Sequence, residues 1–123
     1  MADKFYILVL IDGPGTAYER FASTKELARM GKRPCPENYT IMWEDILPRY
    51  TSISGLLESL ITRFAWSPPK GYGRPVIVSD IIAISENAGR RTRFFYVDPV
   101  GFEELLSFRF DLGRGEVNAP GSE

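Results

Sequence analysis

The chain lacks the side chain on which much acid–base catalysis and zinc binding depend. None of its 123 residues is histidine, which removes the commonest general base, the usual zinc ligand and every serine–histidine or cysteine–histidine nucleophile. Metal sites built only from carboxylates remain open, but Asp12, Asp45, Asp80 and Asp98 show neither ligand spacing nor the calcium-loop pattern. We therefore predict no metal site and no cofactor.

Asp80 and Asp98 are the two carboxylates closest to a catalytic pair. They flank the strands expected at the centre of the domain, where paired carboxylates would serve acid–base chemistry. Both also fall at expected bends, where aspartate usually hydrogen-bonds the backbone. Cys35 stands between two prolines, with no helix N-terminus placed to activate its thiol. We favour structural or incidental roles for all three residues and predict that the chain is not an enzyme.

One basic and aromatic cluster is a candidate binding surface. Arg90, Arg91 and Arg93 stand beside Phe94 and Tyr96, and arginine beside exposed rings is one way to hold single-stranded nucleic acid or a phosphate-bearing partner. The alternative is a solvated hairpin end whose rings belong to the core. We favour this alternative, because an alternating strand buries such rings by default.

A proline-rich loop over residues 66–74 carries a second set of candidate contacts. Trp66, Tyr72 and Arg74 are of the types enriched at interface hot spots. An equal alternative is that Trp66 closes over the preceding helix. If the chain binds a protein, we expect these three side chains and the three arginines to be exposed contacts.

Composition narrows the class of protein. Fifteen basic and sixteen acidic residues give a net charge of -1, which excludes a bulk electrostatic attraction to nucleic acid. A single cysteine cannot form an internal disulfide, and no apolar run approaches the roughly 20 residues of a membrane span. The first residues lead into a strand-like run without a leader-peptide pattern. We therefore expect a cytoplasmic protein without a membrane segment.

The first part of the chain predicts a hairpin, a short helix and a strand. The apolar run 5–11, a turn at 12–15 and alternation over 16–21 favour two paired strands. Ser23 and Glu26 form a capping-box pattern that starts a helix of about two turns, with Leu27 and Met30 on one face. The next strand is expected over residues 38–46, with one face formed by Tyr39, Ile41 and Trp43.

The second part predicts a longer helix and the centre of the sheet. After a cap at Thr51 or Ser52, apolar residues at helical spacing run from Ile53 to Phe64, and Pro68-Pro69 prevents continuation. The apolar runs 76–78 and 81–84 are separated by a bend at Ser79-Asp80. A turn at 86–89 leads into a strand that is apolar on both faces and ends at Asp98-Pro99-Val100-Gly101. We expect one helical turn over 102–106, an edge strand over 107–112 and a disordered tail over 113–123.

These elements predict a single α+β domain over residues 1–112. Its sheet should have four to five strands and be mostly antiparallel, because hairpin-length links cannot join parallel neighbours. The two helices should pack on this sheet.

The central motifs resemble those of the YodL-like domain family. In that family a run of the form SVSDVI precedes a run of the form YYVDSFGF-EL-F, and here RPVIVSDIIAI precedes RFFYVDPVGFEEL. Weaker similarity extends over residues 5–110, and Pro99 and Val100 replace the usual Ser and Phe. The matching positions are Val78, Ser79, Asp80, Ile81, Ile82, Tyr96, Val97, Asp98, Gly101, Phe102, Leu105 and Phe108.

The resemblance implies a genetic context but no particular mechanism. Such domains occur in bacterial conjugative elements, plasmids and phages, without an established enzymatic activity or cofactor, and their best-supported roles are interactions with proteins. The leading hypothesis is therefore a small intracellular protein-binding module that modulates a host or element protein. Alternatives are a nucleic-acid-binding module that uses Arg90–Arg93 and, least favoured, an enzyme using Asp80 and Asp98 with a borrowed metal. For Ser79, Asp80, Tyr96, Asp98, Gly101 and Phe102 we predict structural roles. The partner and the oligomeric state stay open.

Overall fold

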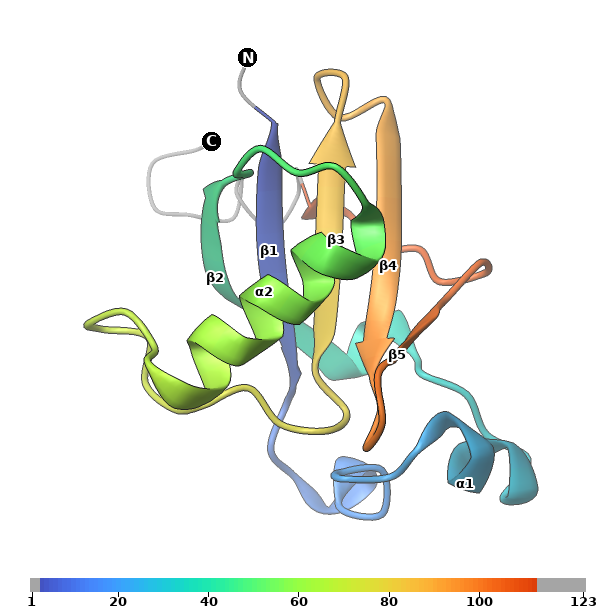
Figure 1. Cartoon of the computed structure of the whole chain (residues 1–123). Helices are drawn as coiled ribbons and strands as arrows, with labels where there is room; N and C mark the ends of the chain where they lie inside the picture. The colour runs from blue at the N-terminus through green and yellow to red at the C-terminus, as the bar shows by residue number, and fades with distance from the viewer. Residues whose placement is uncertain (1–2, 113–123) are drawn as a thin grey trace, which may run out of the picture.

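The protein folds around a five-stranded antiparallel sheet with the strand order β2-β1-β3-β4-β5. This computed structural model describes residues 3–112, so the tail expected over 113–123 lies outside the described residues. Figure 1 shows the long helix α2 crossing one face of the sheet and the short helix α1 near one end. The predicted α+β class is confirmed. The elements are β1 (Lys4–Leu10), α1 (Thr24–Arg29), β2 (Tyr39–Ile46), α2 (Ile53–Trp66), β3 (Ile81–Glu86), β4 (Arg91–Val97) and β5 (Phe102–Glu104), with 3-10 turns at Pro14–Thr16 and Pro36–Asn38.

The sheet divides the apolar side chains into two cores. On one face, Leu57 and Phe64 of α2 lie against β1, β3 and β4, and the Phe64 ring meets Phe5 edge-on with centroids 5.9 Å apart. On the other face, Leu27 of α1 and Phe108 pack with the alternate residues of the same strands. The apolar stripe predicted for α2 and the two-sided burial predicted for β4 are both confirmed.

The caps predicted for the starts of the two helices are also confirmed. The Ser23 hydroxyl accepts a hydrogen bond from the Glu26 amide, and the Glu26 carboxylate accepts one from the Ser23 amide, as a capping box requires. The Ser52 hydroxyl caps α2 by accepting a hydrogen bond from the Gly55 amide. In α1, however, only Leu27 is buried, while Met30 is 46% exposed at the C-cap. The expectation of one shared apolar face was therefore wrong for Met30.

The second strand predicted for residues 16–21 does not form. Both edges of β1 are occupied, by β2 and by β3, so a hairpin partner has no edge to pair with. The segment instead folds into turns, in which the amides of Glu19 and Arg20 donate to the Thr16 carbonyl. The Thr16 hydroxyl fixes the start of these turns by donating to the Ile11 carbonyl at 2.5 Å.

A bulge in β2 overturns the expectation that Tyr39, Ile41 and Trp43 share a face. Ile7 lies opposite Trp43 and Leu8 opposite Ile41, so the register skips Met42. The extra residue reverses the alternation. Tyr39 and Ile41 consequently pack in the α1-side core, whereas Trp43 packs against Phe64 in the α2-side core.

Two further expectations about the C-terminal half were wrong. Residues 102–106 do not form a helical turn; Phe102–Glu104 is the edge strand β5, because the turn after β4 reverses the chain onto that strand. Residues 107–112 form no strand, and Phe108 instead turns inward to pack against Phe94, with centroids 5.0 Å apart. Of the apolar runs around Ser79-Asp80, only the second belongs to a strand.

Ser79 adopts a backbone conformation that L-residues rarely occupy. Its φ is +92°, its side chain is fully buried, and its hydroxyl has no hydrogen-bond partner among the described residues. The amide donates to the Val97 carbonyl at 3.1 Å, and the carbonyl accepts from the Tyr39 hydroxyl at 2.7 Å. These bonds hold the residue in place against the strain.

Replacing Ser79 with glycine should therefore stabilise the protein. Ser79→Gly removes the strained Cβ and loses no hydrogen bond, so we expect the free energy of unfolding to rise by about 1 kcal/mol in urea denaturation. Ser79→Ala keeps the strained Cβ and is the matched control, expected to gain less than the glycine variant. A glycine variant less stable than the alanine variant would show that the conformation is not strained.

Candidate functional site

The end of β4 holds the start of α1 through two side chains. The Tyr96 hydroxyl donates a hydrogen bond of 2.7 Å to the carbonyl of Ala22. The Asp98 carboxylate accepts bonds from the amide and the hydroxyl of Thr24, at 2.9 and 3.0 Å. Tyr96 is fully buried, and burial raises the pKa of its hydroxyl far above the ordinary value, so it remains a donor. These hydrogen bonds fix residues 22–24 to the end of β4 and the residue after it, although the bonded residues are more than seventy positions apart in the sequence.

The turn after β4 completes this corner. The Asp98 amide donates to the Gly101 carbonyl at 3.1 Å, and Gly101 takes a φ of +76° that glycine adopts without steric cost. Phe102 then starts β5, opposite Val97. Asp98 therefore shapes the turn with its backbone and holds α1 with its side chain.

Asp80 is bound within the fold by three donors. Arg74 meets its two carboxylate oxygens at 2.9 and 3.0 Å, and the Ile77 amide donates at 2.9 Å. Burial raises the pKa of Asp80, and the hydrogen bonds from Arg74 and Ile77 oppose that rise. The same ion pair raises the pKa of Arg74. Arg74, predicted as an exposed contact, is instead the partner of a buried carboxylate.

The loop after α2 presents one of its two aromatic candidates. Trp66 is 84% exposed at the end of the helix, so it does not close over α2. Tyr72 is 1% exposed, and its ring meets those of Phe64 and Trp43 at centroid distances of 5.0 and 5.8 Å. The expectation that Tyr72 is an exposed contact was wrong, because the loop folds back and inserts this ring beside α2.

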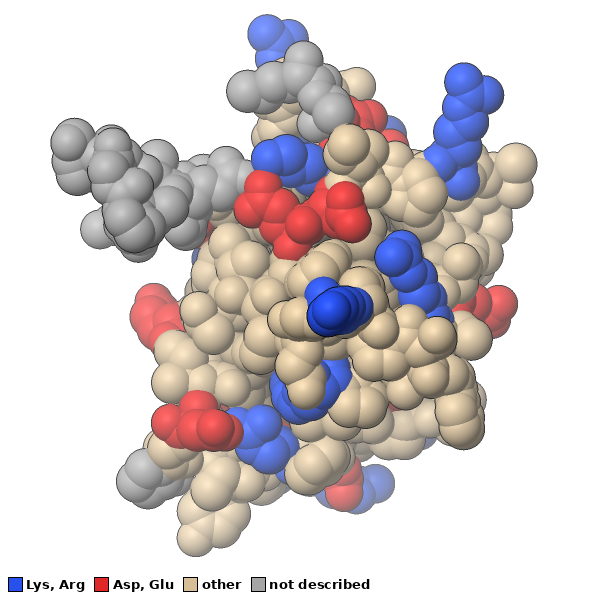
Figure 2. Space-filling view, turned by 90° about the vertical axis from the view of Figure 1, so that its left-hand side faces the viewer, with Lys and Arg blue, Asp and Glu red and all other residues tan. Residues whose placement is uncertain are grey.

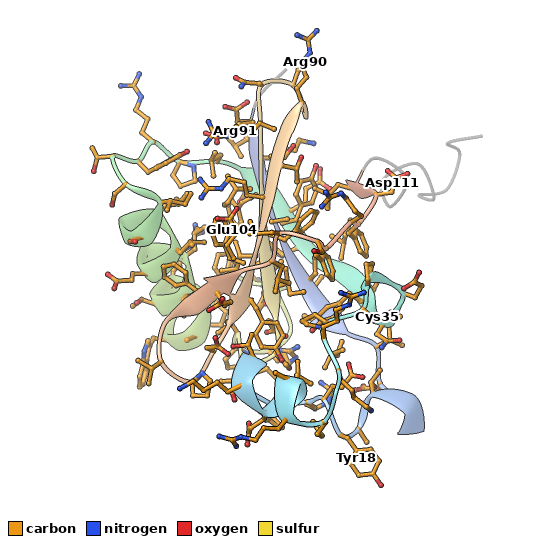
Figure 3. All side chains as sticks on the ribbon, turned by 90° about the vertical axis from the view of Figure 1, so that its right-hand side faces the viewer. Tyr18, Cys35, Arg90, Arg91, Glu104 and Asp111 are labelled. Atoms are coloured by element: carbon orange, nitrogen blue, oxygen red, sulfur yellow. The ribbon has the colours of Figure 1, made fainter. Side chains whose placement is uncertain are left out.

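The arginine cluster is divided between solvent and the sheet. Arg90 and Arg91 are exposed at the tip of the β3–β4 hairpin, at the opposite end of the molecule from Tyr18 (Figure 3). Arg93 forms a two-pronged ion pair with Glu104, both contacts at 3.0 Å, and lies over the Phe95 ring. The expectation of three exposed arginines was therefore wrong for Arg93.

The aromatic half of that cluster is not on the surface. Phe94 is 5% exposed and Tyr96 is fully buried. The alternative that these rings belong to the core is confirmed. A stacking surface for bases beside Arg90 and Arg91 is consequently not formed by these two residues.

Sequence reasoning missed a hollow beside α1 that exposes three apolar side chains. Tyr18 is 77% exposed, Phe21 60% and Met30 46%, and all three line one concavity of about 410 Å³. Figure 3 shows Tyr18 at this end of the molecule, near α1. The remaining lining residues are Arg20, Ala22, Glu26 and Arg29.

Phe21 enters this hollow from a strained backbone. Its φ is +68°, which is unusual for a bulky residue. The next residue, Ala22, is buried and is held by its own amide bond to the Glu19 carbonyl and by the Tyr96 hydroxyl. The chain therefore turns Ala22 into the core and Phe21 out to solvent. Alternating polarity over 16–21 suggested a strand, so no local signal marked Phe21 as exposed.

A second groove, of about 610 Å³, lies on the other side of α1. It runs between Leu27 and Ala28 of the helix, the 32–36 connection and residues 103–108. Cys35 lines it, but its thiol donates to the Glu37 carboxylate, and this hydrogen bond raises the pKa of the thiol. The thiol is thus not activated for nucleophilic chemistry. No cluster of three or more potential metal ligands occurs among residues 3–112.

Fold and site together define a small α+β domain with a surface hollow beside α1. The family model of the YodL-like domain matches residues 4–108, and the chain belongs to this family. Searches of curated proteins and of solved structures gave no match. None of the helices described is long and apolar enough to cross a membrane.

Removing the Asp98 carboxylate should loosen α1. Asp98→Ala loses both hydrogen bonds to Thr24, and we expect the free energy of unfolding to fall by about 1–3 kcal/mol in urea denaturation followed by tryptophan fluorescence. Glu103→Ala changes an exposed carboxylate on the neighbouring strand and should stay within about 0.5 kcal/mol of the unmodified protein. Equal stability of the two variants would contradict the anchoring role of Asp98.

Proposed function

We propose that this chain is a small intracellular protein-binding module that modulates a host or element protein, and that its contact surface is the hollow beside α1. The observation that carries this proposal is the exposure of Tyr18, Phe21 and Met30 around one concavity. Exposed apolar side chains that cluster in one place mark interaction sites, whereas single scattered ones do not.

The residue types suit a protein partner. Tyrosine, phenylalanine, methionine and arginine are enriched at protein interfaces, and Arg20 and Arg29 are also part of the lining here. Methionine adapts its shape to different partners, so Met30 would complement the rigid ring of Phe21. The hollow thus combines a fixed anchor with an adaptable wall.

The hollow is also preorganised. Residues 22–24 are tied to β4 by the Tyr96 and Asp98 hydrogen bonds, so little ordering would be required on binding. Preorganisation of this kind preserves affinity that would otherwise be lost to entropy. The strain at Phe21 fits the same interpretation, because strained conformations persist where the surrounding structure determines them, and they cluster at functional sites.

The biological context is part of the proposal. The YodL-like resemblance supports a protein of a mobile element or phage-related region, and a net charge of -1 gives no bulk attraction to nucleic acid. We propose a cytoplasmic location and binding in place of catalysis. Trp66, Arg90 and Arg91 are also exposed and are the competing candidates for the contact surface.

Affinity capture from host lysate tests the proposal through matched variants. We expect the tagged protein to retain a stoichiometric protein partner after nuclease treatment. Tyr18→Ser combined with Phe21→Gly should lose that partner while melting within about 5 °C of the unmodified protein, since the rings are exposed and the glycine relieves strain.

The controls address the other exposed candidates. Trp66→Ser and the pair Arg90→Ser and Arg91→Ser should leave capture unchanged. Loss of the partner in either control, with retention in the Tyr18/Phe21 variant, would move the contact surface away from α1. Capture that disappears with nuclease would favour the nucleic-acid-binding alternative through the hairpin tip.

A further inference from the structure

We infer that the hollow beside α1 takes an acidic segment of the partner, in which carboxylates flank one aromatic or large aliphatic side chain. This inference rests on the proposed function and specifies the chemistry of the partner. The apolar side chain would enter between Phe21 and Met30, and the carboxylates would meet Arg20 and Arg29, which line the hollow.

The cations come from α1 and the residues directly after it. Lys25, Arg29, Lys32 and Arg33 are all exposed, and none of them takes part in the ion pairs found among the described residues. Arg29 lines the hollow itself. Lys32 and Arg33 line the groove on the other side of α1. The four exposed cations lie within nine residues, and together they create a positive field around α1 that attracts and orients acidic partners.

Glu26, the only carboxylate among the described residues that line the hollow, already takes part in the helix cap of α1. Glu26 accepts the Ser23 amide at 2.8 Å in the capping box of α1. Its charge therefore lies at the start of the helix, where it is stabilised by the helix dipole. Arg29 follows in the last turn of α1 and keeps its guanidinium on the exposed surface.

Arg20 adds a cation that is already positioned. Its guanidinium contacts the Asp12 carboxylate at 2.5 Å, and its side chain is 23% exposed. Asp12, by contrast, is 95% exposed, so the pair lies at the surface, where a second carboxylate can approach the same guanidinium. Arg20 and Arg29 both line the hollow, together with Tyr18, Phe21 and Met30.

The positive charge around α1 is a local feature. The chain as a whole carries one more acidic than basic residue. On the side that lies at the left in Figure 1, acidic and basic side chains are both present (Figure 2). Residues 25–33, by contrast, carry four cations and one carboxylate.

The concave shape favours a side chain over a membrane. A volume of about 410 Å³ accommodates a large side chain and part of its backbone. A flat anionic bilayer would attract the same cations but would not fill a hollow. We accordingly assign the site to a peptide segment and test the membrane as a competing outcome.

Selection from a random dodecapeptide phage library on the immobilised protein tests the inference. We expect enriched sequences to combine acidic residues with one aromatic or large aliphatic residue. A synthetic copy of the most enriched peptide, measured by fluorescence polarisation, should bind Arg29→Glu and Phe21→Gly each about tenfold or more weakly than the unmodified protein. The control pair Arg90→Glu and Arg91→Glu carries a larger charge change at the opposite end and should bind within about twofold.

Each other outcome overturns the inference in a distinguishable way. Enriched peptides without acidic residues that still depend on Phe21 would remove the charge argument and keep the hollow as a protein-binding site. Peptides that depend on Arg90 and Arg91 instead would contradict both the inference and the proposed site. No enrichment over bare support would overturn the peptide assignment, with the proposed function then judged by the lysate capture.

The membrane is tested directly with vesicles. Co-sedimentation with phosphatidylcholine vesicles containing phosphatidylserine should leave the protein in the supernatant. Sedimentation that is lost in Arg29→Glu and in Phe21→Gly would assign the hollow to an anionic bilayer and overturn the inference.

Discussion

The surface beside α1 depends on the last residues of β4 and on Asp98, which follows that strand. The Val97 amide and carbonyl bond Asp80 and Ser79 at 2.9 and 3.1 Å, the Tyr96 hydroxyl holds Ala22, and the Asp98 carboxylate holds Thr24. One short stretch of strand thus joins the bend before β3 to the segment that enters α1. The three contacts made by Val97 and Tyr96 join buried residues, so they are costly to break, because their polar groups would otherwise be unsatisfied.

These contacts connect stability to the proposed binding. Ser79 and Phe21 both have positive φ, and each lies beside a residue that is fixed to β4. Ser79 lies at a buried bend, whereas the ring of Phe21 is exposed to solvent. In the proposed function the family motif would act indirectly. Its buried Tyr96 and its Asp98 hold the segment that presents Phe21, while neither lines the hollow.

Features that depend on local side-chain spacing were predicted correctly from the sequence. The capping box at Ser23, the stripe of α2 and the alternation of β4 follow from side-chain spacing, and all three are present. The strand at 16–21 and the shared face of β2 failed because sheet order and a bulge at Met42 are set by tertiary pairing. Among the candidate contacts, the predicted exposure of the side chain was correct for Trp66, Arg90 and Arg91. It was wrong for Tyr72, Arg74 and Arg93, because each of these side chains packs against or pairs with residues outside its own local segment. Tyr18, Phe21 and Met30 were missed because an exposed apolar residue and a buried one look alike in sequence.

Amide hydrogen exchange, measured by mass spectrometry with and without the captured partner, tests the central claim most directly. The account predicts that binding slows exchange over residues 18–33, where the hollow and its cations lie, and leaves the β3–β4 hairpin tip unchanged. Slowed exchange over residues 87–93, with residues 18–33 unaffected, would contradict it and place the partner at the arginine tip.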